Sequence, residues 1–200
     1  MSEIERLINN LCPNGVNFVR IQDVAEVGTG SRNRNEAVIG GAYNFYVRSR
    51  DVHTINEFEF DEEAIVIPGE GGIGEVFHFV TGKYSLHQRA YRIHFTNRNI
   101  STRFAFFYFE QHFKEFILKK AVSATVTSIR KPMIEDFRIP LPPIEVQREI
   151  VSILDKFTEL EEALEAELEA RKTQYAEFRQ STLDFASRTN VIMTEIGEVC

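Results

Sequence analysis

The feature that most constrains this chain is a long segment near its C-terminus that lacks both proline and glycine. Residues 144–185 contain neither residue, and they follow directly on Pro142 and Pro143. Proline is tolerated in the first turn of a helix but not in its interior, so this arrangement predicts a helix that starts at the proline pair. At about 1.5 Å per residue such a helix would extend roughly 60 Å, which exceeds the width of a small domain.

The apolar residues of this segment recur at helical spacing. Successive steps are three or four residues, with Arg171 filling one position, and two consecutive steps of four around Leu164 indicate a local stutter in a heptad seam. So long a stripe requires a partner outside its own domain; the alternative is that the helix folds back onto that domain. The expected pairing interface consists of Ile150, Ile153, Phe157, Leu160, Leu164, Leu168, Tyr175 and Phe178.

Charge is distributed unevenly along the chain. The net charge is −7, and residues 146–200 carry 6 basic against 12 acidic residues, whereas residues 1–145 carry 17 against 18. Within the first part, residues 76–109 contain basic residues and no acid, while residues 57–63 form an acidic run. This separation permits one basic face, which a polyanion such as DNA requires.

The termini and the cysteines indicate a cytoplasmic protein without membrane contact. No apolar run reaches the length of about 18 residues that a spanning helix needs, and the N-terminus lacks a signal-peptide pattern. Cys12 and Cys200 are far apart and lack metal-ligand spacing, which argues against a disulfide framework or a zinc site.

The middle of the chain predicts short β-strands. In residues 90–95, Tyr91, Ile93 and Phe95 alternate with Arg92 and His94, so the two sets face opposite sides. Glycine-rich residues 69–74 are followed by another strand pattern rather than by a helix, which favours a hairpin-like turn over a nucleotide-binding loop. The expected strands are residues 43–47, 64–68, 76–80 and 90–95, with a further strand within residues 16–27.

Two shorter helices and two loops complete the coarse prediction. Residues 2–11 and 99–121 have helical patterns, the second with Ser101 as its cap and an aromatic stripe that we assign to the core. Residues 134–141 return to an extended apolar pattern. The polar loop of residues 28–35 fits either a phosphate-contacting loop or a solvated surface loop.

No catalytic or metal-binding motif is present. The five histidines lack ligand spacing, and nucleophile-elbow, Walker and dinucleotide-binding signatures are absent. The glutamates of the long segment repeat as an exposed helix face would. We therefore expect neither catalysis nor a cofactor in this chain.

The last ten residues echo an earlier stretch. Residues 191–200 align with residues 19–28 at a constant offset of 172, with Val19 matching Val191 and Val27 matching Val199. The pattern suggests that residues 188–200 begin a second copy of the same unit; the alternative is that they form a tail.

Five stretches together carry a family resemblance. Residues 139–154 (IPLPPIEVQREIVSIL), followed by an acidic heptad helix, resemble the conserved region of type I restriction–modification specificity (S) subunits. Residues 11–16 with 23–27 resemble the start of a target recognition domain of that family. Residues 68–74 and 85–88 resemble its glycine turn and the glutamine that follows.

The resemblance implies an α+β fold and a non-catalytic DNA-reading role. It assigns residues 1–143 to a target recognition domain and residues 144–187 to a spacer helix that pairs as an antiparallel coiled coil with a second copy or a second half. Each recognition domain reads one half of a split sequence in double-stranded DNA. Methyltransferase (M) and restriction (R) subunits are the implied partners, and S-adenosylmethionine, ATP and Mg²⁺ belong to them.

Candidate DNA contacts follow from the residue types near the early loops and after the glycine turn. Arginine and glutamine suit bidentate contacts with guanine and adenine. Two alternatives remain: a coiled-coil interaction module without DNA binding, and the recognition segment of a fused methyltransferase–nuclease. Gln88 also fits a buried structural role. The candidates are Arg32, Arg34, Arg48, Arg50, Lys83, Tyr84, His87, Gln88 and Arg89.

Overall fold

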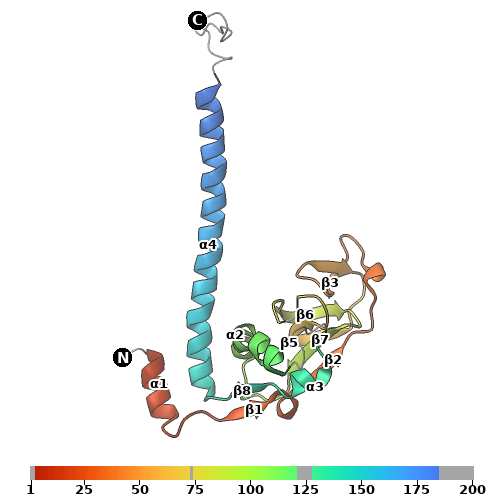
Figure 1. Ribbon diagram of the computed structural model, residues 1–200, viewed down its shortest axis with the longest axis vertical. Coiled ribbons are helices and arrows are strands. Elements are labelled where there is room, and N and C mark those ends of the chain that lie inside the picture. The colour runs from red at the N-terminus through yellow and green to blue at the C-terminus, as the bar shows by residue number, and fades with distance from the viewer. Residues whose placement is uncertain (1–2, 73, 121–127, 185–200) are drawn as a thin grey trace, which may run out of the picture. The chain divides into compact units, whose positions relative to one another are not determined.

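A computed structural model describes residues 3–72, 74–120 and 128–184 and separates two compact units, Met1–Ser152 and Ile153–Cys200. The first unit contains a six-stranded sheet in the order β2-β7-β5-β6-β3-β4 (Figure 1). Only β3 and β6 pair in parallel; the other neighbours are antiparallel. The strands are β2 (Ala25–Thr29), β3 (Tyr43–Tyr46), β4 (Val52–Ile55), β5 (Phe60–Pro68), β6 (His78–Leu86) and β7 (Ala90–Phe95).

A separate two-stranded ribbon joins the beginning and the end of the first unit. β1 (Phe18–Arg20) pairs antiparallel with β8 (Arg138–Pro140), and the Leu141 amide donates to the Asn17 carbonyl at 2.8 Å. The remaining short elements of this unit are α1 (Glu3–Leu11), the 3-10 helices η1 (Ile21–Asp23) and η2 (Arg34–Glu36), and α3 (Lys131–Glu135).

The main core lies between α2 (Thr102–Lys120) and one face of the sheet. The Ser101 hydroxyl caps this helix by accepting from the Phe104 amide at 3.3 Å. Phe109 and Phe113 are fully buried and pack in one cluster with Ile65 of β5 and Ile93 of β7. The alternation predicted for β7 is confirmed, because Ile93 and Phe95 join this core while Arg92 pairs with a carboxylate on the opposite face.

The opposite face of the sheet carries a second, more polar cluster. Tyr84 is fully buried there, and its hydroxyl donates to Glu62 at 2.9 Å. Glu62 also accepts two hydrogen bonds from Arg92 at 2.9 and 3.0 Å, and both charged side chains are largely buried. A buried charge is tolerated only when it is paired, and each member of this group has its partner.

The start of the long helix α4 (Ile144–Leu183) is fixed within the first unit by one buried amide side chain. Gln147 is fully buried, and its Nε2 donates to the carbonyls of Asn99 and Pro142, each at 2.8 Å. Its Oε1 accepts from the Ser101 amide at 2.9 Å. Three main-chain groups that would otherwise lack partners are thereby satisfied.

The second unit holds the remainder of α4, and its apolar stripe is exposed. Ile150 and Ile153 at the beginning of the stripe are half-buried. The other members of the predicted interface are 54–67% exposed: Phe157, Leu160, Leu164, Leu168, Tyr175 and Phe178.

The predicted β-rich domain followed by a long helix is confirmed, and the differences are local. The strand expected at residues 76–80 is wrong in its bounds, because the glycine-rich connection continues to Phe77 and β6 runs on to Leu86. β4 was not predicted, and α3 occupies part of the segment 134–141 that was expected to be extended. Residues 191–200, which carry the predicted repeat, lie outside the described residues.

Candidate nucleic-acid interface

The early polar loop and the segment after β6 form one structure, although more than fifty residues separate them in the chain. Arg32 and His87 form a parallel bridge, and the Gln88 amide donates to the Arg32 carbonyl at 3.0 Å. The Gln88 side chain is exposed and donates from Nε2 to Asn33 Oδ1 at 2.7 Å. The alternative of a buried structural role for Gln88 is therefore wrong, although the side chain does help to hold the loop.

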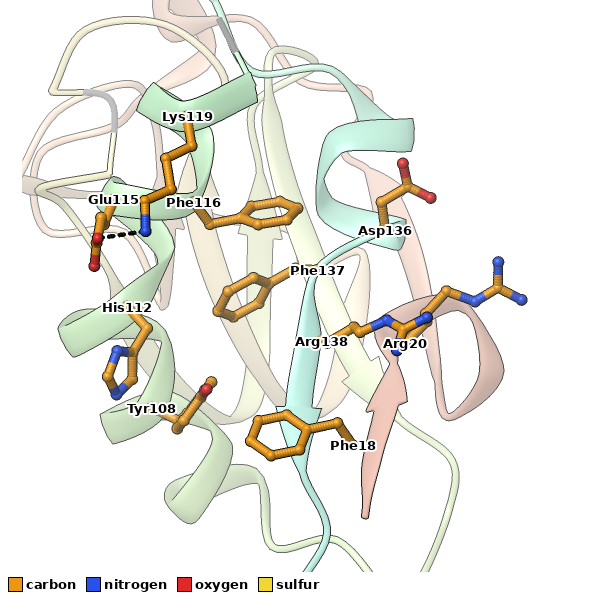
Figure 2. Close-up of a pocket in the computed structure, with 10 residues that line it drawn as sticks. All are labelled: Phe18, Arg20, Tyr108, His112, Glu115, Phe116, Lys119, Asp136, Phe137 and Arg138. Atoms are coloured by element: carbon orange, nitrogen blue, oxygen red, sulfur yellow. Dashed lines mark ion pairs between the residues drawn. The ribbon is translucent and has the colours of Figure 1, made fainter. Parts of the chain in front are cut away.

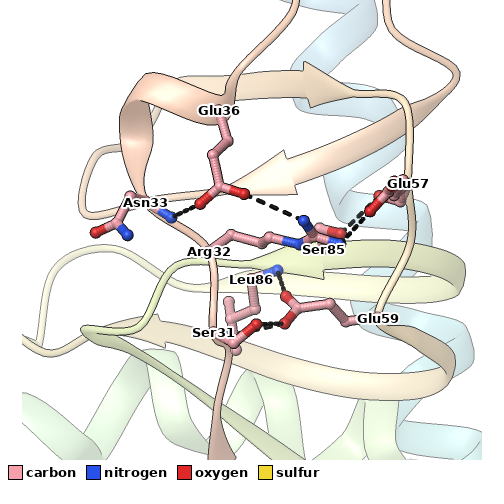
Figure 3. A network of polar contacts seen from close by, with 8 residues as sticks. All are labelled: Ser31, Arg32, Asn33, Glu36, Glu57, Glu59, Ser85 and Leu86. Atoms are coloured by element: carbon pink, nitrogen blue, oxygen red, sulfur yellow. Dashed lines mark hydrogen bonds and ion pairs between the residues drawn. The ribbon is translucent and has the colours of Figure 1, made fainter.

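Two carboxylates brace this loop from the connection before β5, as Figure 3 shows. Arg32 donates to Glu57 and, at 3.1 Å, to Glu36. Glu59 accepts from the Ser31 amide at 2.9 Å and from the Leu86 amide at 3.0 Å. The hydrogen bonds from Arg32 raise its own pKa, and the loop is held by charge-assisted contacts rather than left as a free solvated segment.

Glu70 follows Gly69 in the glycine-rich connection, and it forms ion pairs with two of the candidate arginines. Its carboxylate accepts from Arg48 Nη1 at 2.9 Å and from Arg89 Nη1 at 3.2 and 3.4 Å. The hydrogen bond from Arg48 is the largest of the effects that lower the pKa of Glu70, and the hydrogen bond from Arg89 is the next. Glu70 therefore remains ionised at neutral pH between the two guanidinium groups.

Two open cavities adjoin Glu70. One, of about 260 Å³, is lined by Arg34, Arg48 and His87. The other, of about 390 Å³, is lined by Gln88, Arg89 and Arg130. The structure thus brings together five of the nine candidates, namely Arg34, Arg48, His87, Gln88 and Arg89.

His87 lies within this cluster, where its surroundings favour the neutral imidazole. Its ring is almost fully buried, and Nδ1 accepts from the Arg89 amide at 3.0 Å. Burial lowers the pKa of His87, and the nearby charges of Arg48 and Arg89 lower it further. The imidazole therefore acts as a neutral acceptor that orients Arg89, and the positive charge of the cluster comes from arginine.

The remaining candidates lie elsewhere or are committed to other contacts. The prediction of Tyr84 as a DNA contact is wrong, because its side chain is fully buried on one face of the sheet. Its hydroxyl donates a hydrogen bond to Glu62. Lys83 is exposed, and its ammonium lies 4.6 Å from the centre of the Phe58 ring. Arg50 donates weakly to the Glu75 carbonyl at 3.5 Å, and Arg32 is held by its two carboxylates.

The separation of charge predicted from the sequence does not survive folding. The acidic run of residues 57–63 lies on and before β5, which is the antiparallel neighbour of both β6 and β7. Glu57 accordingly pairs with Arg32, and Glu62 with Arg92. Segments of opposite charge therefore become neighbours in the sheet, and several of the basic side chains are paired with carboxylates.

Sequence reasoning missed two members of this cluster. Arg130 lines the second cavity beside α3, and Glu70 lies between the two cavities. For Arg130 the chain offers no signal, because residue 130 reaches the site through the hydrogen bond from the Ile129 amide to the Gly69 carbonyl, at 2.8 Å. For Glu70 a signal existed: a charged residue inside a glycine-rich turn is held near the main chain of neighbouring segments.

A cleft separate from these two cavities lies between α2 and the β1–β8 ribbon. Figure 2 shows the aromatic side chains that line it. Its volume is about 610 Å³, and Phe18, Tyr108 and Phe137 are among its lining residues. Lys119 is paired with Glu115 at its rim. None of the nine candidate DNA contacts lines this cleft.

Two other kinds of feature are absent from the described residues. No group of three or more His, Cys, Asp or Glu side chains in this part of the chain is arranged to hold a metal ion. Among the helices that the structure describes, none combines the length and the apolarity that crossing a membrane requires.

In sequence, the chain matches one family. The model of the type I restriction modification DNA specificity domain matches residues 13–170. The chain is 30% identical over 168 residues to the type I restriction enzyme EcoDI specificity subunit of Escherichia coli. The match covers 84% of this chain and 37% of that protein.

Two solved structures share the fold of this chain. A chain from work on complex assembly and conformational transition of the type I R-M system aligns with a TM-score of 0.66 at 18% identity, over 90% of this chain and 47% of that one. The type I restriction–modification S subunit of M. genitalium aligns with a TM-score of 0.63 at 18% identity, over 86% and 48%. At this identity the likeness shows the fold alone, and the chain spans less than half the length of all three relatives.

Proposed function

Because the chain belongs to the family of type I restriction–modification DNA specificity domains, we propose that it reads one half of a bipartite DNA target without catalysing a reaction itself. The observation that carries this proposal is the cluster of Arg34, Arg48, Arg89 and Arg130 around the two cavities beside Glu70. Four guanidinium groups from four separate parts of the chain converge there.

The chemistry of the cluster suits a nucleic acid. Guanidinium groups bind phosphates in bidentate geometry and also read guanine edges. Gln88, exposed beside Arg89, has an amide suited to the edge of adenine. Phosphate contacts fix the register of a protein on DNA and base contacts select the sequence, so the arginines serve mainly as positioning groups and Gln88 as the candidate base reader.

The long helix has a separate role in this proposal. The exposed stripe of α4 pairs antiparallel with the same stripe of a second copy, or of a second half, and sets the distance between two half-sites. M and R subunits dock on the assembled protein and bring S-adenosylmethionine, ATP and Mg²⁺, and the complex works in the cytoplasm. Support comes from the family membership and from the exposure of Leu160, Leu164 and Phe178.

A competition assay with random-sequence duplex tests DNA binding. The chain, alone and with its M subunit, should bind labelled duplex, and the affinity should fall steeply between about 50 and 200 mM salt, since each released phosphate counterion contributes a slope of about 0.9. Arg34→Ala with Arg89→Ala should weaken binding at least roughly tenfold and reduce that slope by about two.

A matched double variant controls for the loss of two positive charges. Arg20→Ala with Arg138→Ala removes the same charge from the cleft between α2 and the ribbon, and it should change the affinity much less. If no DNA association appears at low salt even with the M subunit, the exposed stripe favours the second candidate function, a coiled-coil interaction module.

A further inference from the structure

Glu70 is the only acidic side chain that lines either cavity of the candidate interface, among the residues that the structure describes. We propose that its carboxylate occupies a phosphate-binding site, which a phosphate of the DNA backbone takes over when DNA binds. Glu70 is then a resident competitor that weakens binding to any duplex. This inference rests on the proposed DNA-reading function.

The geometry at Glu70 is that of an anion site. Two guanidinium groups that are far apart in the chain, those of Arg48 and Arg89, donate to one carboxylate at 2.9 to 3.4 Å. A phosphodiester carries the same single negative charge and accepts hydrogen bonds from guanidinium groups in the same way as a carboxylate. The ligand class is therefore a phosphate monoanion.

The charge balance of the site favours an additional anion. Arg34, Arg48, Arg89 and Arg130 line the two cavities against Glu70 alone, and the lowered pKa of His87 leaves its ring neutral. Within the described part of the chain, Arg34 and Arg130 make no ion pair of their own. One carboxylate thus leaves the positive charge of the site largely uncompensated.

Solvent can reach the pairs that Glu70 makes. The side chains of Arg48, Glu70 and Arg89 are 43%, 38% and 58% exposed. Ion pairs of this exposure contribute little to stability, because water and salt screen them. Displacing the carboxylate by an external phosphate therefore leaves the fold intact.

The main chain keeps Glu70 close to the site after displacement. The Gly69 amide donates to the Arg89 carbonyl at 2.9 Å, and a Cβ at Gly69 would lie 2.7 Å from that carbonyl oxygen. On the other side of Glu70, Gly71 and Gly72 adopt φ angles of +70° and +66°, which L side chains rarely allow. The displaced carboxylate thus remains near the arginines and repels the incoming phosphate.

The test compares two charge-neutralising variants of the same connection. Glu70→Gln removes the competitor, whereas Glu75→Gln removes a carboxylate that pairs with Lys114 of α2 instead. The full 200-residue chain is titrated into random-sequence duplex at low salt, with fluorescence anisotropy as the readout. We expect Glu70→Gln to bind roughly fivefold tighter than wild type, and Glu75→Gln to stay within about twofold.

A double variant separates competition from an indirect effect. Adding Arg89→Gln to Glu70→Gln should return the affinity to the wild-type value or below, because the gained phosphate contact needs both arginines. A gain that survives this second change would overturn the inference.

Failure of the inference and failure of the proposed function are distinguishable. If wild type binds duplex and Glu70→Gln binds no tighter than Glu75→Gln, then Glu70 is only a structural brace and the DNA-reading role stands. If no variant binds DNA at low salt, both proposals are wrong.

A measurement on the wild-type chain avoids any dependence on variants. Inorganic phosphate at tens of millimolar should shift the Nε–H NMR signals of Arg48 and Arg89, because it competes directly with the carboxylate. Unchanged arginine signals would contradict a phosphate site at this position.

Discussion

The two units of this chain use apolar residues at the same helical spacing in opposite ways. In α2, Phe109 and Phe113 are completely buried against the sheet, whereas in α4, Leu164 and Phe178 are 64% and 67% exposed. The spacing alone predicts that a face will be buried, but it does not say against what. The first unit supplies its own partner in the sheet, and the second leaves its stripe exposed.

Ion pairs of the two units also differ in how far they are buried. In the first unit, the Arg92–Glu62 ion pair joins two different strands and is largely buried. In α4, Arg171–Glu167 and Lys172–Glu169 each join residues about one turn apart in the same helix, and all four side chains are exposed. Pairs of that kind contribute only a few tenths of a kcal/mol each, so the stability of the helix depends on how its stripe is covered.

The largest effect is expected from charges placed on the exposed stripe. Leu160→Glu together with Leu164→Glu should abolish self-association, because two copies would lose four buried leucines, worth on the order of 6 kcal/mol or more. Sedimentation velocity of the variant and of wild type measures the change.

The matched control adds the same two charges away from the stripe. Thr158→Glu with Ala166→Glu should leave the association of the chain intact, since both positions lie off the apolar face of α4. A dimer that persists in the leucine variant would show that the stripe is not the interface.

The next largest effect is expected at the clamp that begins α4. Gln147→Leu leaves the Asn99 and Pro142 carbonyls and the Ser101 amide without their partner, which should lower the free energy of unfolding by about 2–4 kcal/mol. Chemical denaturation measures this loss. Gln111→Leu, on the exposed face of α2, should cost less than about 0.5 kcal/mol, and an equal loss in both variants would contradict the clamp.

A smaller effect concerns pH and the first unit alone. Burial lowers the pKa of His78 from its ordinary value, so below about pH 6.5 the unfolded chain binds more protons than the folded one. The contribution of His78 to the free energy of unfolding is therefore fully present above that pH. It falls as the pH drops, by at most about 1.4 kcal/mol per pH unit. His87 acts in the same direction.

Denaturation at neutral and at mildly acidic pH tests the His78 contribution. His78→Gln should reduce the loss of stability on acidification, whereas His112→Gln, an exposed histidine on α2, should retain the wild-type loss. A loss unchanged in His78→Gln would show that His78 does not contribute.

The smallest effect is expected at an exposed apolar residue that does not belong to a stripe. Ile39 is fully exposed in a turn held by Thr54, whose hydroxyl accepts from the Gly41 amide at 3.2 Å. Ile39→Ser should change neither the free energy of unfolding, beyond about 0.5 kcal/mol, nor the self-association of the chain. A clear change in sedimentation would mean that isolated exposed residues also form the interface.

The sequence predicted the elements better than their partners. The start of α4, the Ser101 cap and the alternation in β7 all follow from local rules, and they are confirmed. The aromatic side chains of α2 do pack in the core, as predicted, but the sequence did not rank them by burial. Almost every turn of this helix carries phenylalanine, so periodicity could not separate fully buried Phe109 and Phe113 from half-buried Phe107 and Tyr108.

The site could be predicted as residue types but not as an arrangement. Local patterns identified Arg48 and Arg89, but their convergence on Glu70 depends on the sheet order, in which the parallel pairing of β3 with β6 brings distant segments together. The burial of Tyr84 likewise depends on the register of β6 against β5, which no local rule gives. Long-range pairing is the information that a single sequence holds least directly.

The ribbon of β1 and β8 also has a consequence for biosynthesis. Phe18 pairs with Pro140, so the first unit cannot close until more than 120 further residues have left the ribosome. At roughly 5–20 residues per second, β1 remains without its partner strand for several seconds or more. Such a nascent chain exposes an unpaired strand edge during synthesis. The yield of folded protein should therefore depend on chaperones more than the yield of a protein built from local contacts does.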